Sequence, residues 1–275
     1  MDLSNLALSF LAISIASTSV SSSGTGPRTA SGQQAPAGAP QRDPAALTLA
    51  RLSVQALIDN QGLTDATVQG TANYTAGSDQ ESGVFTLEVK GNQQSKLVLN
   101  LSGGTRQEIR QVQAGAWSGP DGQKHPIALH NCWTDASSLL PVFTLQAALT
   151  NPQIAALYVG QATVNGVTAD HLQLFQVVAG QSQKMTTEIQ QLSAMEIYLD
   201  ALSHLPVAVA FSAHPDDNLR LSFPVEVRFS GYQQLGSIQA PARVQKFLQG
   251  SLTLDLSVTN VAVNSGIPNS DFSTQ

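Results

Sequence analysis

From Asp65 onward, the chain largely alternates between apolar and polar residues, which is the pattern of strands with one buried face. The clearest example contains Phe85, Leu87 and Val89, which are separated by single polar residues. Short turn-forming pairs such as Asn165-Gly166 separate several of these runs, at spacings that favour β-hairpins. The same pattern predicts further strands within residues 97–101, 105–117, 154–163, 171–178, 195–200, 206–213, 225–232, 238–248 and 251–263.

Two segments have a helical pattern instead. Asp43 and Pro44 form an N-cap and a first-turn proline, and apolar residues then recur at helical spacing as far as Ile58. Residues 133–149 form the second segment, in which the apolar positions cover a broader arc than the single stripe of a surface helix. We therefore expect the second helix to be buried against the sheet.

These elements indicate a mainly β (α+β) fold. The strands outnumber the helices and leave little room for βαβ crossovers, so an antiparallel sheet is expected. The simplest architecture is a curved antiparallel half-barrel of about 10–11 strands that embraces two or three helices. All-β barrels and sandwiches of this length commonly form one unit, which we place at residues 44–275.

The amino terminus is predicted to direct export. A short apolar run at residues 6–15 is followed by small residues, which together resemble a signal peptide spanning residues 1–23. The run is too short to cross a bilayer as an integral segment. Residues 24–43, rich in Ser, Gly, Ala and Pro, are predicted to be a flexible linker. We therefore expect a periplasmic or secreted protein.

The charge and the cysteine content of the chain exclude some kinds of partner and of cross-link. Only 12% of the residues are charged and the net charge is −6, so no basic stripe is available to neutralise phosphates, and nucleic acid is not an expected partner. The single cysteine, Cys132, excludes a disulfide within the chain.

Two groups of residues are candidates for metal chemistry. His214-Pro215-Asp216-Asp217 is similar to the motif of zinc-dependent de-N-acetylases, but Asn218 replaces the expected Glu and no later histidine follows. A β-turn with Pro215 at its second position explains these residues better. His125, His130 and Cys132 are close in sequence but lack an evident fourth ligand for zinc. The sequence therefore predicts no catalytic residue, no metal site and no cofactor, and a zinc-dependent hydrolase is the least favoured function.

Several segments are shared with a known family of proteins. They are Asn165-Gly166-Val167, residues 196–200 leading to Leu205-Pro206-Val207, residues 225–232 leading to Ala240-Pro241, the strand 254–263 and the tail 267–272. These segments and the order of the elements resemble the LolA/LolB-like (outer-membrane lipoprotein-sorting) superfamily of bacterial envelope proteins. The resemblance covers the chain from about Pro44 and implies a half-barrel that carries lipid or lipoprotein acyl chains between its sheet and helices.

Large apolar side chains are the candidate lining of such a cavity, since ligand sites are concave and mostly apolar. The first hypothesis is a non-enzymatic carrier or binding protein whose partner is a lipid or an acylated protein. The alternative is an envelope interaction module with a filled core that binds another protein through a sheet edge or loop surface. The candidate cavity residues are Phe85, Leu87, Leu99, Trp117, Trp133, Phe143, Tyr158, Phe175, Tyr198 and Phe211.

Overall fold

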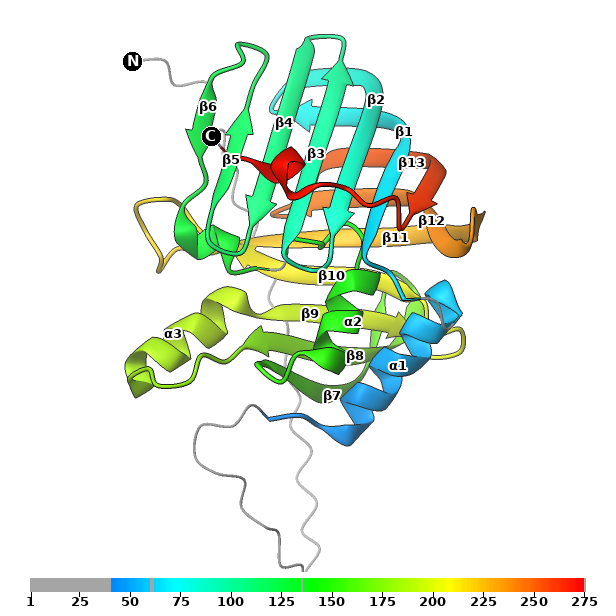
Figure 1. Ribbon diagram of the computed structural model, residues 1–275, viewed down its shortest axis with the longest axis vertical. Helices are drawn as coiled ribbons and strands as arrows, with labels where there is room; N and C mark the ends of the chain where they lie inside the picture. The colour runs from blue at the N-terminus through cyan, green and yellow to red at the C-terminus, as the bar shows by residue number, and fades with distance from the viewer. Residues whose placement is uncertain (1–40, 60–61, 135, 275) are drawn as a thin grey trace, which may run out of the picture. The chain divides into compact units, whose positions relative to one another are not determined.

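Thirteen strands form one antiparallel sheet in the part of the chain that the structure, a computed structural model, describes: residues 41–59, 62–134 and 136–274 (Figure 1). The mainly β half-barrel expected from the sequence is confirmed. The strands are β1 (Asp65–Ala76), β2 (Asp79–Lys90), β3 (Gln94–Leu101), β4 (Gly104–Gln111), β5 (Gly115–Ser118), β6 (Lys124–Pro126), β7 (Ile154–Val164), β8 (Val167–Gln176), β9 (Met195–Asp200), β10 (Pro206–Ala213), β11 (Phe223–Leu235), β12 (Ile238–Leu248) and β13 (Ser251–Val263).

The sheet consists of two meanders joined side by side. One runs from β1 outward to β6, and the other runs from β13 outward to β7. They are joined where β1 pairs with β13, so β6 and β7 are the two edges and the sheet does not close into a barrel. The strand number exceeds the prediction of 10–11, partly because residues 105–117 form two strands and the short β6 had no alternating pattern long enough to detect.

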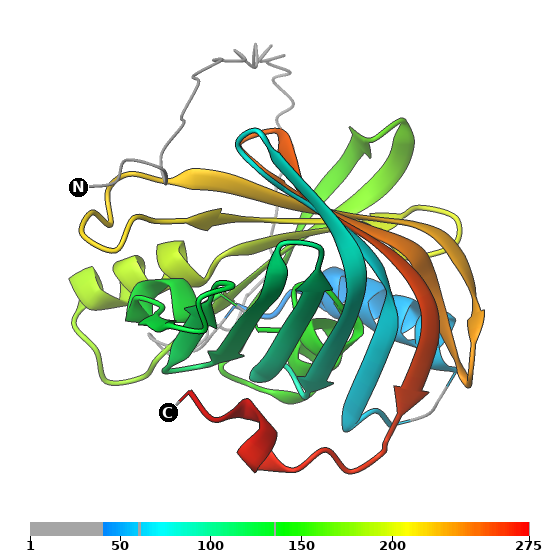
Figure 2. The same ribbon diagram turned by 90° about the horizontal axis from the view of Figure 1, so that it is seen from above.

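The sheet curls strongly, so that β2 and β12 face each other across the interior (Figure 2). A β-bulge at Gln69/Gly70 contributes to the bend where the two meanders join. A Cβ atom at Gly70 would lie 1.9 Å from the Ser257 carbonyl oxygen, so only glycine allows the two backbones to approach this closely.

Two helices fill much of the concave side. α1 (Pro44–Ile58) begins as predicted, because the Asp43 carboxylate accepts a hydrogen bond from the Ala45 amide. Its buried residues Ala46, Ala50, Ser53 and Leu57 form one stripe, which packs towards α2 (Val142–Thr150), β7 and β12.

The prediction of a helix over residues 133–149 is wrong at its start. α2 begins only at Val142, after Pro141, while η1 (Leu129–Cys132) is a 3₁₀ turn and the residues between form turns. The residue before a proline is driven out of the helical region, which explains the late start. The predicted burial is confirmed, since Val142, Phe143, Leu145 and Ala148 are all buried.

A third helix, α3 (Gln183–Ser193), had no specific prediction. Ser182 caps it by accepting a hydrogen bond from the Met185 amide, and only Ile189, Leu192 and Ser193 are buried. The spacing of Met185, Ile189 and Leu192 was the signal that could have identified it.

The two ends of the described chain are both attached to the sheet. Arg42 forms a bridge with Ala156 of β7, and its guanidinium donates hydrogen bonds to carbonyl groups at the C-terminal end of α2, including Ala148 and Asn151. The last residues of the predicted linker therefore contact the domain. After β13, Phe272 in η2 (Asn269–Phe272) packs with Ile267 against Ile109, on the face of β4 away from the helices.

The predicted signal peptide, residues 1–23, and most of the predicted linker lie outside the described residues. Within those described, no helix has both the length and the hydropathy needed to cross a bilayer.

Candidate functional site

The space between the concave sheet face and the segment before α2 is almost completely filled. Its lining comes mainly from β2, β12 and β13, with Leu139 and Leu140 closing the remaining side. The gap that is left has a volume of about 10 Å³, which is no more than one water molecule needs. We call this space the inner gap. The surrounding apolar side chains are in contact with one another rather than with an open cavity.

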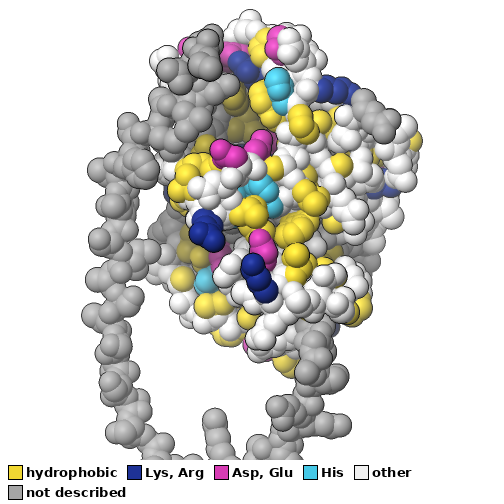
Figure 3. Space-filling model, turned by 90° about the vertical axis from the view of Figure 1, so that its left-hand side faces the viewer, with side chains coloured by type: hydrophobic (Ala, Val, Ile, Leu, Met, Phe, Trp, Pro, Cys, Tyr) yellow, Lys and Arg dark blue, Asp and Glu magenta, His cyan; other side chains and the backbone are white. Residues whose placement is uncertain are grey.

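A larger space lies at one end of the half-barrel, between the β4–β5 turn, η1, the end of β8 and α3. Its volume is about 410 Å³, which falls within the range of small-molecule sites, and it is open to solvent. We call it the end groove. The face of the molecule on the left of Figure 1 exposes several groups of hydrophobic side chains between charged ones (Figure 3). The end groove is lined by Val112, Gln113, Leu129, Trp133, Gln176, Val178 and Ile189.

The lining of the end groove is apolar except for the side-chain amides of Gln113 and Gln176, and two of its apolar residues are partly exposed. Leu129 is 51% exposed and Val178 is 37% exposed. The side-chain amide of Gln176 already donates a hydrogen bond within the protein, to the Trp133 carbonyl at 2.9 Å. The groove therefore suits an uncharged, apolar segment of a ligand.

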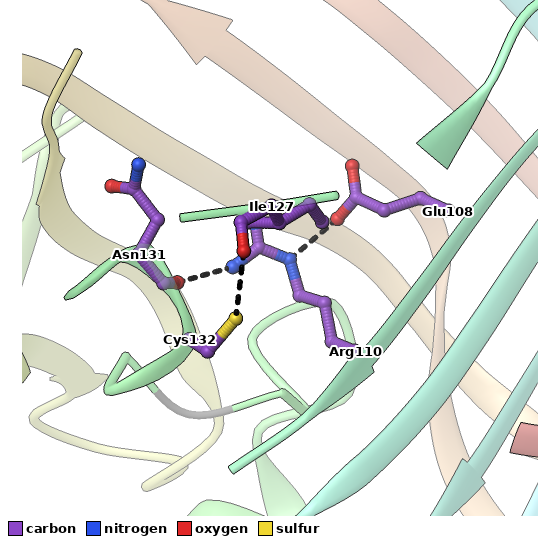
Figure 4. A network of polar contacts seen from close by, with 5 residues as sticks. All are labelled: Glu108, Arg110, Ile127, Asn131 and Cys132. Carbon is purple, nitrogen blue, oxygen red and sulfur yellow. Dashed lines mark hydrogen bonds and ion pairs between the residues drawn. The ribbon is translucent and has the colours of Figure 1, made fainter. Parts of the chain in front are cut away.

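Arg110 holds one wall of the end groove in place (Figure 4). Its Nη1 donates a hydrogen bond to the Asn131 carbonyl at 2.7 Å, and its Nε donates one to Glu108 at 2.5 Å. Asn131 also exchanges two hydrogen bonds with the His214 backbone, which joins η1 to the β10–β11 loop. Since η1 supplies Leu129, these contacts decide where that side chain lies.

Three side chains in this wall have shifted pKa values. Burial of Glu108 is the largest influence and raises its pKa, but attraction to Arg110 and Lys246 and the hydrogen bond from Arg110 together lower it to about 2. The pKa of Arg110 is raised, because the nearby Glu108 outweighs desolvation. Burial raises the pKa of the Cys132 thiol, so Cys132 behaves as a neutral core side chain.

The structure separates the predicted cavity residues into groups. Phe85, Leu87, Leu99 and Phe143 belong to the core, and the first two also line the inner gap. Tyr158 and Phe211 pack partly against this core. Of the predicted cavity residues, Trp133 alone lines the end groove.

Two of the predicted residues lie on the opposite face of the sheet. Tyr198 alternates with the core residues Ile197 and Leu199, and it stacks on His171 with ring centroids 4.4 Å apart. Phe175 likewise alternates with Leu174, so neither residue can contribute to the concave surface. The size of these side chains suits a cavity, but the alternation along β8 and β9 places them on the convex face.

Trp117 is 43% exposed and pairs with Glu108 across β4 and β5, on the concave face beyond the core. Its ring stacks on His125, with ring centroids 4.3 Å apart. The other residues of the end groove had no prediction as site residues, because they come from a strand end, turns and two helices that have no shared sequence pattern.

The candidate metal ligands have other contacts. His130 Nε2 lies 3.1 Å from the Pro215 carbonyl oxygen, and the Cys132 thiol donates a hydrogen bond to the Ile127 carbonyl at 3.9 Å. Residues 215–218 form a turn as expected, but Pro215 occupies its first position rather than the second, since the Asn218 amide donates to the Pro215 carbonyl. In the described ranges, no three His, Cys, Asp or Glu side chains gather in a way that could hold a metal ion.

The chain has a LolA/LolB-like fold. It is similar to a domain from Vibrio parahaemolyticus described as an outer membrane lipoprotein-sorting protein, with a TM-score of 0.51, 11% identity and coverage of 83% of this chain and 96% of that one. It is also similar to a LolA superfamily protein from Nitrosomonas europaea, with a TM-score of 0.50, 9% identity and coverage of 83% and 97%. No family model and no curated protein sequence matches the chain. At such low identity, the similarity concerns the fold alone.

Proposed function

We propose that this protein is a non-enzymatic carrier or binding protein of the periplasm or the extracellular space, and that it binds a lipid or the acyl chain of a modified protein in the end groove. The observation that carries the proposal is the contrast in volume between the groove, at about 410 Å³, and the inner gap, at about 10 Å³. The lipoprotein-sorting description of the Vibrio protein with the same fold supports this substrate class.

Trp133 gives a direct test, because it lines the end groove and the chain contains only two tryptophans. In a Trp117→Phe protein, Trp133 is the only tryptophan. Stearate carrying a nitroxide near its methyl end, and the methyl ester of the same compound, should both quench Trp133 fluorescence at micromolar concentration. Excess unlabelled stearate should restore the fluorescence. If neither compound quenches the fluorescence of Trp133, the carrier proposal is wrong.

The second candidate is an envelope interaction module. The filled inner gap favours it, as do the exposed Leu129 and Val178, since exposed apolar surface is typical of protein-binding sites. Protein recovered from the envelope fraction and examined by native mass spectrometry separates the candidates. A bound lipid supports the carrier, whereas a stable complex with a polypeptide and no lipid supports the module.

A further inference from the structure

The side chains that line the end groove are all uncharged. Among the described residues, the lining consists of five apolar side chains and the two amides of Gln113 and Gln176. A neutral ligand that enters such a groove exchanges only neutral hydrogen bonds with water, whereas an ionised ligand gives up the hydration of a full charge. The groove therefore distinguishes ligands by the charge of the part that contacts its wall.

Gln113 is placed at the groove by a tight turn. The Gln111 amide donates a hydrogen bond to the Ala114 carbonyl at 2.7 Å, so Val112 and Gln113 are the two residues at the tip of the β4–β5 connection. Both of these tip residues line the groove. Gln113 is exposed, and its side chain makes no hydrogen bond with another of the described residues. Its amide group is therefore available to a ligand as a donor.

Gln176 has less to offer a ligand than Gln113. Its Nε2 already donates a hydrogen bond to the Trp133 carbonyl, at 2.9 Å. The remaining polar atom of this amide is the Oε1 oxygen, which can only accept a hydrogen bond. A carboxylate has no proton to donate to such an oxygen, so Gln176 does not favour an ionised ligand.

Arg110 supports the wall of the groove but does not add a positive charge to its lining. Its guanidinium lies between the Asn131 carbonyl and Glu108 and donates a hydrogen bond to each (Figure 4). Arg110 is not among the residues that line the groove. Because the pKa of Glu108 is about 2, its carboxylate compensates this guanidinium at neutral pH. A carboxylate bound in the groove would thus meet no uncompensated cation in the lining.

We infer that the end groove selects acyl groups whose carbonyl belongs to an uncharged ester or amide, with Gln113 as the residue that donates a hydrogen bond to this carbonyl. The inference rests on the proposed function and adds the substrate class. An ester or amide carbonyl needs one donor and carries no net charge, so the Gln113 amide satisfies it. A free fatty acid has the same chain, but one amide donor does not replace the hydration of its carboxylate.

Nitroxide-labelled stearate and its methyl ester differ at the head group alone and therefore test this selection. In the Trp117→Phe protein at neutral pH, quenching of Trp133 should show that the ester binds about tenfold more tightly than the acid. Equal affinities, or tighter binding of the acid, would overturn this inference and leave the carrier proposal intact. If neither compound binds, the carrier proposal itself is wrong.

Gln113→Ala tests the donor. This variant should reduce the preference for the ester about fivefold, because the ester carbonyl loses its hydrogen bond. Its thermal midpoint should equal that of the parent protein, since Gln113 is exposed and its side chain has no partner among the described residues. A preference that is unchanged in Gln113→Ala would show that Gln113 does not select the ligand.

Gln113→Lys tests the role of charge, because it places an ammonium group in a lining that has no charge. This variant should reverse the preference, so that the acid binds more tightly than the ester. Gln80→Lys is the matched control, since Gln80 is exposed in β2, does not line the groove and gains the same charge. If both lysine variants shift the preference equally, the effect is one of overall charge and the inference is wrong.

Two further ligands distinguish a lipid from an acylated protein as the source of the acyl group. Nitroxide-labelled monostearoylglycerol presents the carbonyl as a lipid ester. An uncharged peptide amide with the same labelled stearoyl group on its amino terminus presents it as the amide of a modified protein. Each should bind more tightly than the acid, and the tighter of the two identifies the source. If both bind more weakly than the acid, the groove does not recognise a neutral carbonyl and the inference is wrong.

Discussion

The inner gap and the end groove are lined by the same kinds of side chain, but they differ in what covers them. In the inner gap, Leu139 and Leu140 close against β2 and β12, and the side chains of the sheet are buried as a core. At the end groove, η1 and α3 stand apart, so Leu129 and Val178 remain partly exposed. Apolar surface thus contributes to stability in the first region and is available to a ligand in the second.

The strongest test of this difference is a charge placed in the filled region. Phe143 is 2% exposed in α2, so Phe143→Asp would bury a carboxylate without a partner. We expect the free energy of unfolding to fall by more than about 4 kcal/mol, which is enough to unfold many domains. Circular dichroism during thermal unfolding measures this.

The matched control for that change is Leu202→Asp, because Leu202 is 93% exposed in the β9–β10 turn. Its free energy of unfolding should stay within about 0.5 kcal/mol of wild type. A folded Phe143→Asp protein with a normal thermal midpoint would show that α2 does not belong to the core.

Arg110 holds η1 beside the end groove, and its removal should have the next largest effect. Arg110→Met leaves Glu108 without its ion pair and the Asn131 carbonyl without its donor. We expect a loss of about 2–3 kcal/mol in the free energy of unfolding, measured with urea. Arg110→Met with Glu108→Gln should recover part of this loss.

The outer ion pair of Arg243 with Asp255 provides the comparison, since Arg243→Met should cost at most about 1 kcal/mol. Equal losses for Arg110→Met and Arg243→Met would mean that the concave position of Arg110 has no energetic consequence.

The lowered pKa of Glu108 predicts a dependence on pH. Its pKa falls from an ordinary value of 4.5 to about 2 in the folded protein, so the charged form stabilises the fold above about pH 4.5. This stabilisation is lost as the pH falls from 4.5 to about 2. The difference in thermal midpoint between wild type and Glu108→Gln should therefore be largest above pH 5 and shrink across that window. A difference that does not change between pH 7 and pH 2 would contradict the assigned pKa.

The smallest effect on stability is expected in the end groove itself. Because Leu129 is already 51% exposed, Leu129→Glu should change the free energy of unfolding by no more than about 0.5 kcal/mol. The same change should abolish binding of the nitroxide-labelled methyl ester, since it places a carboxylate in the path of the acyl chain. Leu202→Glu should bind the ester normally. Undiminished binding to Leu129→Glu would place the ligand elsewhere.

Much of the sheet could be predicted from the sequence, because strand formation depends on local patterns. The boundaries of β9, β10, β12 and β13 agree with the predicted ranges 195–200, 206–213, 238–248 and 251–263. The turn at Asn165-Gly166 also follows from local chemistry, since both residues have positive φ angles, of 52° and 80°, as a two-residue hairpin turn requires. α1 was predicted for the same reason, from its cap and its stripe.

The candidate site was much less predictable. Alternation tells which residues share a face, so Tyr198 and Phe175 could have been assigned to the convex face from Ile197 and Leu174 alone. Alternation does not show which parts of a face are covered by another segment of the chain. Trp133 reaches the end groove because Pro141 delays the start of α2 and leaves the preceding residues as turns.

The sequence by itself determined the local elements of this protein: the strands, their turns and the first helix, all of which follow from the spacing of neighbouring residues. Only the tertiary structure decided that the inner gap is filled and the end groove open. The physical reason is that burial depends on segments that lie far apart in the sequence, and no local pattern records their distance.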